Sequence, residues 1–275
     1  MPRPNAIDSR RRAPAVLRWP AGLLAGALAL AGCGSSPPAT ISLPGPGQAQ
    51  AADGPALQTE RVRYTRSQPG CSGQDCPTID VDALRFPNDP KLTALVDEAL
   101  AAMTGLDVNV RHPYRTLEEF EQYYWRTAQP RDSTTLRASL VRQTPALAVI
   151  ELLSGVYTGG AHGIPATQFL NWDRQAQRVL SLDDVLEPGR KADYVKALER
   201  AHAAWLQTNE DARQDRAAYD KMWPFVPSEN YALAQDGLVV KYDVYVIAPY
   251  SHGQPALTIP YEQLRGILRP AYLPG

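Results

Sequence analysis

The sequence predicts an α+β fold, in which an antiparallel β-sheet has helices packed on one face. Strand-like segments follow one another in runs, and helix-like segments are grouped between those runs instead of alternating with them. The composition is that of a globular protein, with 44% hydrophobic, 21% charged and 8% aromatic residues among 275. We therefore expect a chain that buries a core, and we exclude disordered, collagen-like and coiled-coil proteins.

The first predicted strand covers residues 78–86. Apolar Ile79 and Val81 alternate there with polar neighbours, which is typical of a half-buried strand. The apolar positions then shift phase to Leu84 and Phe86, which predicts a β-bulge within the strand.

Two helices are expected next. The first covers residues 90–103, where apolar side chains recur at helical spacing and either Asn88 or Asp89 can cap the start. The second begins after Thr116, which forms the S/T-x-x-E capping pattern with Glu119. Both helices precede the main run of strands.

Four strand-like segments follow, and short polar or glycine-rich turns separate them. This spacing is typical of an antiparallel meander. The predicted strands are 134–142, 147–157, 167–172 and 178–182.

The C-terminal part begins with helical periodicity over residues 191–208 and again over 211–222. His202 lies on the inward face of the first of these helices, where we expect a core histidine whose ring is hydrogen-bonded. Asp236-Gly237 is a hairpin-turn signal. This turn joins predicted strands at 231–234 and 238–248, and a strand at 257–259 and a helix at 261–268 follow.

The N-terminal segment is typical of an export signal. A basic stretch ending at Arg18 precedes an apolar run of about ten residues, which is too short to cross a ~30 Å hydrocarbon layer as a permanent helix. The run ends in Leu-Ala-Gly-Cys, which resembles a bacterial lipobox. We predict a lipoprotein signal peptide at 1–32 and lipidation, with palmitate among the acyl chains, at Cys33. An ordinary cleavage site with a coincidental cysteine is the alternative.

A disordered tether is expected at residues 33–57, because they are rich in Gly, Ser, Pro, Ala and Gln and nearly free of charge. No Asp follows the lipidated cysteine, so we expect an anchor in the outer membrane of a Gram-negative host, facing the periplasm. The folded part is expected to contain a small α/β subdomain at 58–130 and an α+β domain at 131–275.

The cysteines fit an oxidising compartment. Besides Cys33 the chain holds Cys71 and Cys76, which are separated by four residues that include a glycine, and the periplasm would join them in a local disulfide. A metal site would need two further ligands, and no Cys or His lies close in sequence to supply them. We therefore predict neither a metal nor a cofactor.

The distribution of charge argues against a nucleic-acid partner. Residues 1–32 carry five Arg and one Asp, so the rest of the chain has 23 basic and 28 acidic residues and a net charge of −5. That charge modestly favours encounter with a cationic protein.

No catalytic motif stands out in the sequence. It contains no G-x-S-x-G, H-E-x-x-H, phosphate-binding loop or dinucleotide-binding glycine motif, and its four histidines share no i, i+4 spacing. We expect a monomeric binding protein and not an enzyme. Carboxylates that are distant in sequence but converge in space are the alternative.

Two segments between strands have the composition of binding loops. Their glycines permit positive φ angles, and their tyrosines and histidines combine aromatic area with hydrogen-bonding groups, as in antibody-like binding surfaces. The alternative is that the glycines only form tight turns and the tyrosines pack on the sheet. The candidate partner-binding residues are Tyr157, Thr158, Gly159, Gly160, His162, Pro249, Tyr250 and His252.

These loops belong to a wider resemblance. Residues 157–162 (YTGGAH), 171–173 (NWD) and 180–186 (LSLDDVL), and later 237–264, resemble the C-terminal domain of the RsiV-like family. Residues 79–103 resemble the small domain that usually precedes it and that also occurs before some peptidoglycan deacetylases.

The best understood member of that family is a membrane anti-sigma factor whose outer domain binds lysozyme. The resemblance therefore implies that this chain recognises a protein, and the expected partner is a lysozyme-type muramidase. A structural or peptidoglycan-binding role in the envelope is the alternative. We expect no sigma-factor regulation, because no sigma-binding segment is visible in the sequence.

Overall fold

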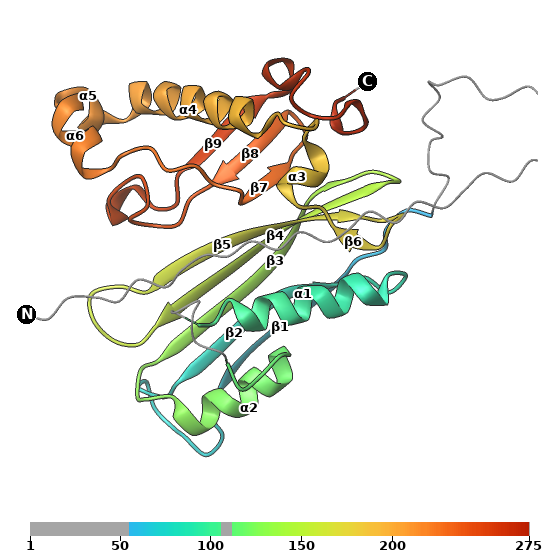
Figure 1. Cartoon of the computed structure of the whole chain (residues 1–275). Helices are drawn as coiled ribbons and strands as arrows, with labels where there is room; N and C mark the ends of the chain where they lie inside the picture. Colours follow the sequence, from blue (N-terminus) through green and yellow to red (C-terminus); the bar gives the residue numbers. More distant parts are fainter. Residues whose placement is uncertain (1–54, 106–111, 275) are drawn as a thin grey trace, which may run out of the picture. The chain divides into compact units, whose positions relative to one another are not determined.

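The structure is a computed structural model, and it describes residues 55–105 and 112–274 (Figure 1). The predicted signal peptide at 1–32 and the predicted lipidation site Cys33 lie outside these residues. Most of the predicted tether, 33–57, lies outside them too. The structure corrects the end of the predicted tether. Leu57, its last residue, is buried in the core, so the folded part begins earlier than predicted.

The largest element is a six-stranded sheet whose strands lie side by side in chain order. Its strands are β1 (Glu60–Ser67), β2 (Thr78–Arg85), β3 (Ser133–Gln143), β4 (Leu147–Tyr157), β5 (Ile164–Asp173) and β6 (Arg178–Val179). Neighbours pair antiparallel except β2 and β3, which run parallel. Parallel neighbours need a long crossover, and the two helices between them supply it.

Those helices, α1 (Pro90–Ala102) and α2 (Leu117–Thr127), cover one face of the sheet (Figure 1). Asp89 caps α1 and Thr116 caps α2, each side chain accepting a hydrogen bond from a backbone amide of the first turn (3.1 and 3.2 Å). The fold class that the sequence predicts, α+β with helices on one face of a largely antiparallel sheet, is confirmed. The core between the helices and the sheet includes Ile79, Val81, Leu92, Leu100, Phe120, Leu136 and Ile150.

A second layer packs against the other face, over β4 and β5. Successive residues of β4 face different cores, since Val149 packs with the second layer while Ile150 packs with α1 and α2. The layer contains an antiparallel sheet of β7 (Tyr231–Leu233), β8 (Gly237–Lys241) and β9 (Ala256–Pro260), the helix α4 (Lys191–Thr208), and the short helices α3 (Leu182–Val185), α5 (Glu210–Gln214) and α6 (Arg216–Met222).

Two predicted elements are shorter in the structure because local signals end them. The strand predicted at 178–182 stops after two residues, since Ser181 and Asp184 form a capping box that begins α3. The helix predicted at 261–268 is a single 3₁₀ turn, and Gly266 at φ +72° follows it.

Two further predictions about strands are wrong for tertiary reasons. The strand predicted at 238–248 ends at Lys241, because the side chain of Asp243 bonds to the backbone of β5 and draws the chain out of the ladder. The predicted bulge at 78–86 is absent from β2, which pairs with β1 in unbroken register and places Ala83 on the buried face. The register shift in this sheet lies in β3 instead.

Cys71 and Cys76 form a disulfide in the connection between β1 and β2, with their Cα atoms 5.8 Å apart. The sheet is continuous across the boundary expected between 58–130 and 131–275, because β2 pairs with β3. That division of the chain stays a prediction. Among the described residues, no helix is long and apolar enough to span a bilayer.

Candidate functional site

The first predicted loop connects β4 to β5 and is exposed. Gly159 and Gly160 have φ angles of +95° and +93°, which L-residues rarely adopt, so glycine is required by the turn itself. The hydroxyl of Tyr157 donates to the carbonyl of Gly160 (3.1 Å) and holds the loop in shape. Thr158 and His162 are exposed beside it.

The second predicted loop follows β8 and is fastened to β5 by a polar clamp. One carboxylate oxygen of Asp243 accepts from the amide of Thr167 (2.9 Å) and from the side chain of Gln254 (2.8 Å). The hydroxyl of Thr167 donates to Gln254 in turn (3.0 Å). Because β5 starts where the first loop ends, this clamp brings the two loops together.

The two loops meet through their aromatic rings. The ring of His162 stacks on the ring of Tyr250, with centroids 3.6 Å apart and planes 17° from parallel. The hydroxyl of Tyr250 donates to the carbonyl of Gly163 (2.9 Å), which ties the second loop to the first. The structure therefore unites residues from both predicted segments in one place.

Two aromatic residues that the sequence analysis did not select complete the group. Tyr245 is 52% exposed, its hydroxyl lies 3.3 Å from Nε2 of His162, and its ring centroid is 5.7 Å from that of Tyr250. Trp223 stacks toward Tyr245 at 6.5 Å. We call His162, Trp223, Tyr245 and Tyr250 the aromatic surface.

Tyr245 also has an unusual backbone, with φ +68° in a residue that is not glycine. Such a conformation costs about 1–3 kcal/mol and tends to persist where function requires it. Tyr245 was not predicted because the apolar run 238–248 is typical of an uninterrupted strand. Trp223 was not predicted because it follows a helical stretch and carries no turn signal.

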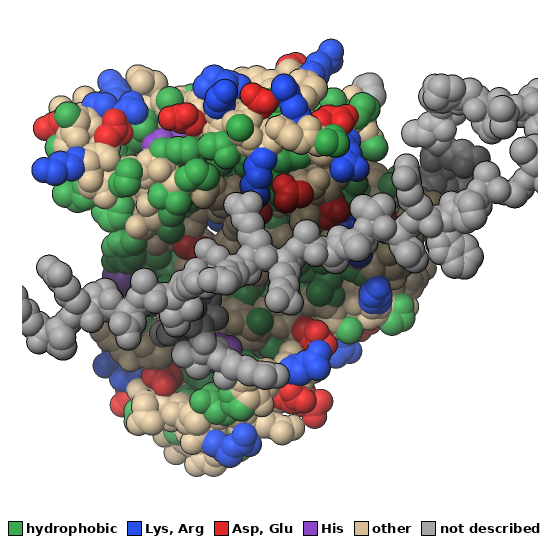
Figure 2. All heavy atoms as spheres, in the orientation of Figure 1, with side chains coloured by type: hydrophobic (Ala, Val, Ile, Leu, Met, Phe, Trp, Pro, Cys, Tyr) green, Lys and Arg blue, Asp and Glu red, His purple; other side chains and the backbone are tan. Residues whose placement is uncertain are grey.

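A shallow apolar groove of about 350 Å³ continues from the aromatic surface along α5 and α6. Met222, which is 69% exposed, lines it together with Tyr219, Trp223 and Pro249. Asp211 and Asp215 also line it, and we call these two carboxylate residues its acidic rim. His252 lies at this rim, with Nε2 3.6 Å from Asp211. Figure 2 shows hydrophobic side chains gathered on the side where α6 and the loop after β4 lie.

The polar groups of the aromatic surface take part in local contacts, since the hydroxyl of Tyr250 bonds to the backbone and that of Tyr245 lies beside His162. In the described part of the chain, no group of three or more His, Cys, Asp or Glu could hold a metal ion. Burial raises the pKa of Tyr219, whose hydroxyl is bonded to Asn209 (3.2 Å), so it stays protonated under the groove. Tyr157 points into its own loop and lies outside the aromatic surface.

Fold and site together define a class of protein, an α+β module with two sheets whose loops present aromatic side chains. The chain belongs to the DUF3298 family of proteins of unknown function. The family model matches residues 183–262, and a DUF3298 family protein from Pseudomonas aeruginosa PAO1 has a crystal structure that is 40% identical with a TM-score of 0.73. That match covers 80% of this chain and 97% of the other.

Two further similarities are more limited. A DUF3298 family member from Bacteroides fragilis NCTC 9343 is 22% identical with a TM-score of 0.60, covering 78% of this chain and 94% of that one, and it shows the fold alone. The peptidoglycan-N-acetylmuramic acid deacetylase PdaC of Bacillus subtilis (strain 168) is 30% identical over 120 residues. This match spans 42% of the chain but only a quarter (25%) of the enzyme. Membership of the RsiV-like family stays a prediction.

Proposed function

We propose that this chain is a lipid-anchored cell-envelope protein that binds a partner protein through the aromatic surface, and that the partner is a lysozyme-type muramidase. The observation that carries this proposal is the stack of Tyr250 on His162, which joins two exposed loops into one surface. Attachment through Cys33 and a position in the outer membrane facing the periplasm are part of the proposal.

The aromatic surface has the properties that binding requires. Tyrosine and tryptophan supply large contact areas while losing little conformational entropy, and they are enriched among the residues that dominate binding energy. The clamp from Asp243 to β5 holds the second loop before any partner arrives, which lowers the ordering cost of association. The acidic rim at Asp211 and Asp215 favours a cationic partner.

A location in the cell envelope is supported by a relative and by the cysteines. The similar region of PdaC belongs to an enzyme named for its action on peptidoglycan. The disulfide between Cys71 and Cys76 suits an oxidising compartment. We propose a monomer that binds without catalysing a reaction.

Calorimetric titration of the chain with several lysozymes tests the proposal. We expect saturable heat with at least one of them, and we expect Tyr245→Ala and Tyr250→Ala each to weaken binding by about tenfold or more. Val141→Ala is the matched control, because Val141 is an exposed apolar residue of β3 outside the aromatic surface. Absence of heat with every lysozyme would rule out this partner.

Binding of peptidoglycan is the second candidate, and the named activity of PdaC favours it. Exposed Tyr245 and half-buried Tyr250 could then stack on sugar rings instead of on a protein. Retention of the chain on purified peptidoglycan, lost in Tyr245→Ala and accompanied by no response to any lysozyme, would favour this alternative.

A further inference from the structure

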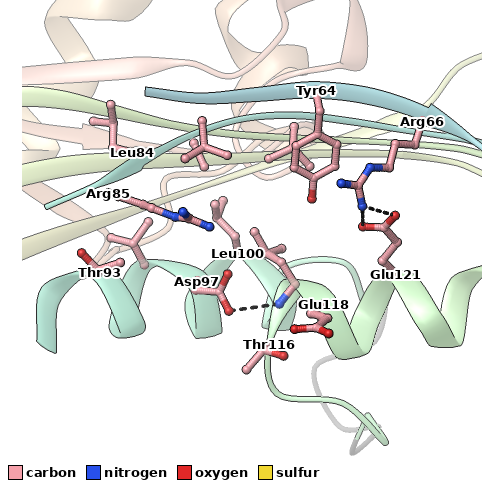
Figure 3. Close-up of a pocket in the computed structure, with 15 residues that line it drawn as sticks. Tyr64, Arg66, Leu84, Arg85, Thr93, Asp97, Leu100, Thr116, Glu118 and Glu121 are labelled. Atoms are coloured by element: carbon pink, nitrogen blue, oxygen red, sulfur yellow. Dashed lines mark hydrogen bonds and ion pairs between the residues drawn. The ribbon is translucent and has the colours of Figure 1, made fainter. Parts of the chain in front are cut away.

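A cavity of about 550 Å³ lies between the strands β1 and β2 and the helices α1 and α2 (Figure 3). It is separate from the aromatic surface, which is built from other elements. Cavities of this size are typical of sites for small molecules. Its apolar walls come from all four elements and include Val62, Val81, Leu100 and Leu117.

Polar contacts brace the cavity at two points. Asp97 of α1 accepts a hydrogen bond from the amide of Leu117 (3.1 Å), which fixes the start of α2 against α1. Arg66 of β1 donates to both carboxylate oxygens of Glu121 (2.7 and 2.9 Å), and its guanidinium lies 4.4 Å from the centre of the Tyr64 ring. These contacts link α2 to α1 and to the sheet on opposite sides of the cavity.

The charged groups around the cavity are unevenly matched. Arg66 and Glu121 neutralise each other, but Arg85 forms no ion pair or hydrogen bond with any other described residue. Asp97 uses one oxygen for the amide of Leu117, and Glu118 likewise has no partner among the described residues. Within residues 55–105 and 112–274, the exposed side chains of Arg85 and Glu118 and one oxygen of the half-buried Asp97 are therefore without a partner.

The positions of these three groups indicate where a ligand would lie. Arg85 extends from the end of β2, Asp97 faces it from α1, and Glu118 stands further along on α2 (Figure 3). The carboxyl group of Asp97 is half-buried, and burial raises its pKa. The hydrogen bond from Leu117 and the charge of Arg85 oppose this effect, and the charges of Glu98 and Glu118 add to it. A ligand cation beside Asp97 would relieve this unfavourable burial of charge.

We propose that this cavity binds a diamino acid, that is, an α-amino acid whose aliphatic side chain ends in a second ammonium group. The α-carboxylate pairs with Arg85 and the α-ammonium with Asp97. The second ammonium reaches Glu118, and the methylene chain lies along the partly exposed apolar lining, which includes Val62 and Leu84. Such a ligand carries one negative and two positive charges, which complements the unmatched groups of the cavity. The site is distinct from the proposed function and does not rest on it.

The test uses three probes that differ by one group each. Lysine carries all three charges, norleucine lacks the second ammonium, and 1,5-diaminopentane lacks the carboxylate. Each is added to the ¹⁵N-labelled full chain, and amide shifts of α1, α2 and β2 are followed by NMR, with both enantiomers of the two amino acids. We expect lysine, in at least one configuration, to saturate these shifts and to bind about tenfold more tightly than either of the other probes.

Substitutions in the cavity should remove these preferences one at a time. Arg85→Ala should abolish the preference for lysine over 1,5-diaminopentane, and Glu118→Gln should abolish the preference over norleucine. Asp97→Asn should weaken the binding of all three probes. The variant should keep the fold, because the amide oxygen of Asn still accepts the hydrogen bond from Leu117. Glu98→Gln is the matched control, because Glu98 neighbours Asp97 but lies outside the cavity, near Arg115 (3.5 Å).

Two results would overturn the proposal. One is the absence of saturable shifts at the cavity with every probe. The other is binding of lysine that persists unchanged in Arg85→Ala, Asp97→Asn and Glu118→Gln. A response to lysozyme in the same preparation is independent of both results, so failure here and failure of the proposed function can be told apart.

Discussion

The rings of Tyr250 and His162 stack with centroids 3.6 Å apart, although Tyr250 lies in a loop of the three-stranded sheet and His162 in a loop of the six-stranded sheet. The contact depends on the second layer being fastened along the outer edge of β5. Asn230 contributes to this fastening by bridging the backbone, since its side chain accepts from the amide of Phe169 (2.9 Å) and donates to the carbonyl of Thr167 (2.7 Å). Side chains thus satisfy a strand edge that would otherwise be open.

The stack should rigidify the loop after β4. Tyr250→Ala removes both the ring contact with His162 and the hydrogen bond to Gly163, so amide exchange over residues 158–163 should accelerate by several-fold to about tenfold. Hydrogen-exchange mass spectrometry measures this, and Tyr250→Phe, which keeps the stack, should show a smaller change. Equal exchange in the Ala variant and the parent would show that the stack does not order the loop.

The side chain of Asn171 links the two layers in the interior. It is fully buried, donates to the carbonyl of Tyr231 (2.7 Å) and accepts from the amide of Leu233 (2.9 Å). Asn171→Ala leaves both backbone groups unpaired, so the free energy of unfolding should fall by about 2–4 kcal/mol. Urea denaturation tests this against Gln168→Ala, an exposed change on the same strand that should cost less than about 0.5 kcal/mol. Similar losses in both variants would refute the argument.

His202 differs from the expectation drawn from the sequence, because its ring is not fully hydrogen-bonded. It is 3% exposed, its Nε2 has no hydrogen-bond partner among the described residues, and it stacks on Trp205 and packs near Phe225. Burial lowers the pKa of His202, and Arg216 lowers it further, while Asp220 and Glu199 act in the opposite direction. The folded protein therefore favours the neutral form of this ring.

This lowered pKa predicts a loss of stability in acid. Below the ordinary histidine pKa of about 6.5 the unfolded chain binds a proton that the folded chain resists, so the free energy of unfolding should decrease as the pH falls through that value. Urea denaturation of the parent and of His202→Phe between pH 5 and pH 8 measures the effect. The other histidines are common to both proteins, so a weaker dependence of the free energy of unfolding on pH in the variant would be due to His202. The same dependence in both proteins would contradict the prediction.

Lipidation at Cys33 is open to a direct test. In a bacterial host the parent protein should partition into the membrane and the detergent phase, while Cys33→Ser should not, because a thioether-linked lipid needs the sulfur. The double variant Cys71→Ser/Cys76→Ser is the control and should partition like the parent. Mass spectrometry of an unmodified residue 33 in the mature parent would refute the lipoprotein prediction.

Local signals predicted much of the fold. The caps at Asp89 and Thr116, the bounds of α4 and the meander of β3 to β6 follow from residues close in sequence. The strand β1 was missed although Val62 and Tyr64 alternate in it, because charged or polar residues occupy the remaining positions. Arg61 and Arg63 are accommodated by Asp82 on the neighbouring strand, with Arg63 at 2.8 Å, and Arg66 pairs with Glu121 of α2.

The candidate site was predicted only in part. Sequence composition pointed to both loops, since glycines and aromatic residues between strands are visible without coordinates. Tyr245 and Trp223 were not selected, because their exposure depends on where β8 ends and on how α6 packs. The cavity beside Arg85 has no sequence motif at all, since its walls come from four separate elements.

The sequence by itself determined the class of fold, the local caps and turns, and the two segments rich in aromatic residues and glycine. These features need only short-range hydrogen bonds and hydrophobic periodicity, which neighbouring residues supply. Only the tertiary structure decided that the segments meet and that charges gather around an open cavity. Both depend on contacts such as Asp243 to Thr167, between residues far apart in the chain, whose pairing no local pattern encodes.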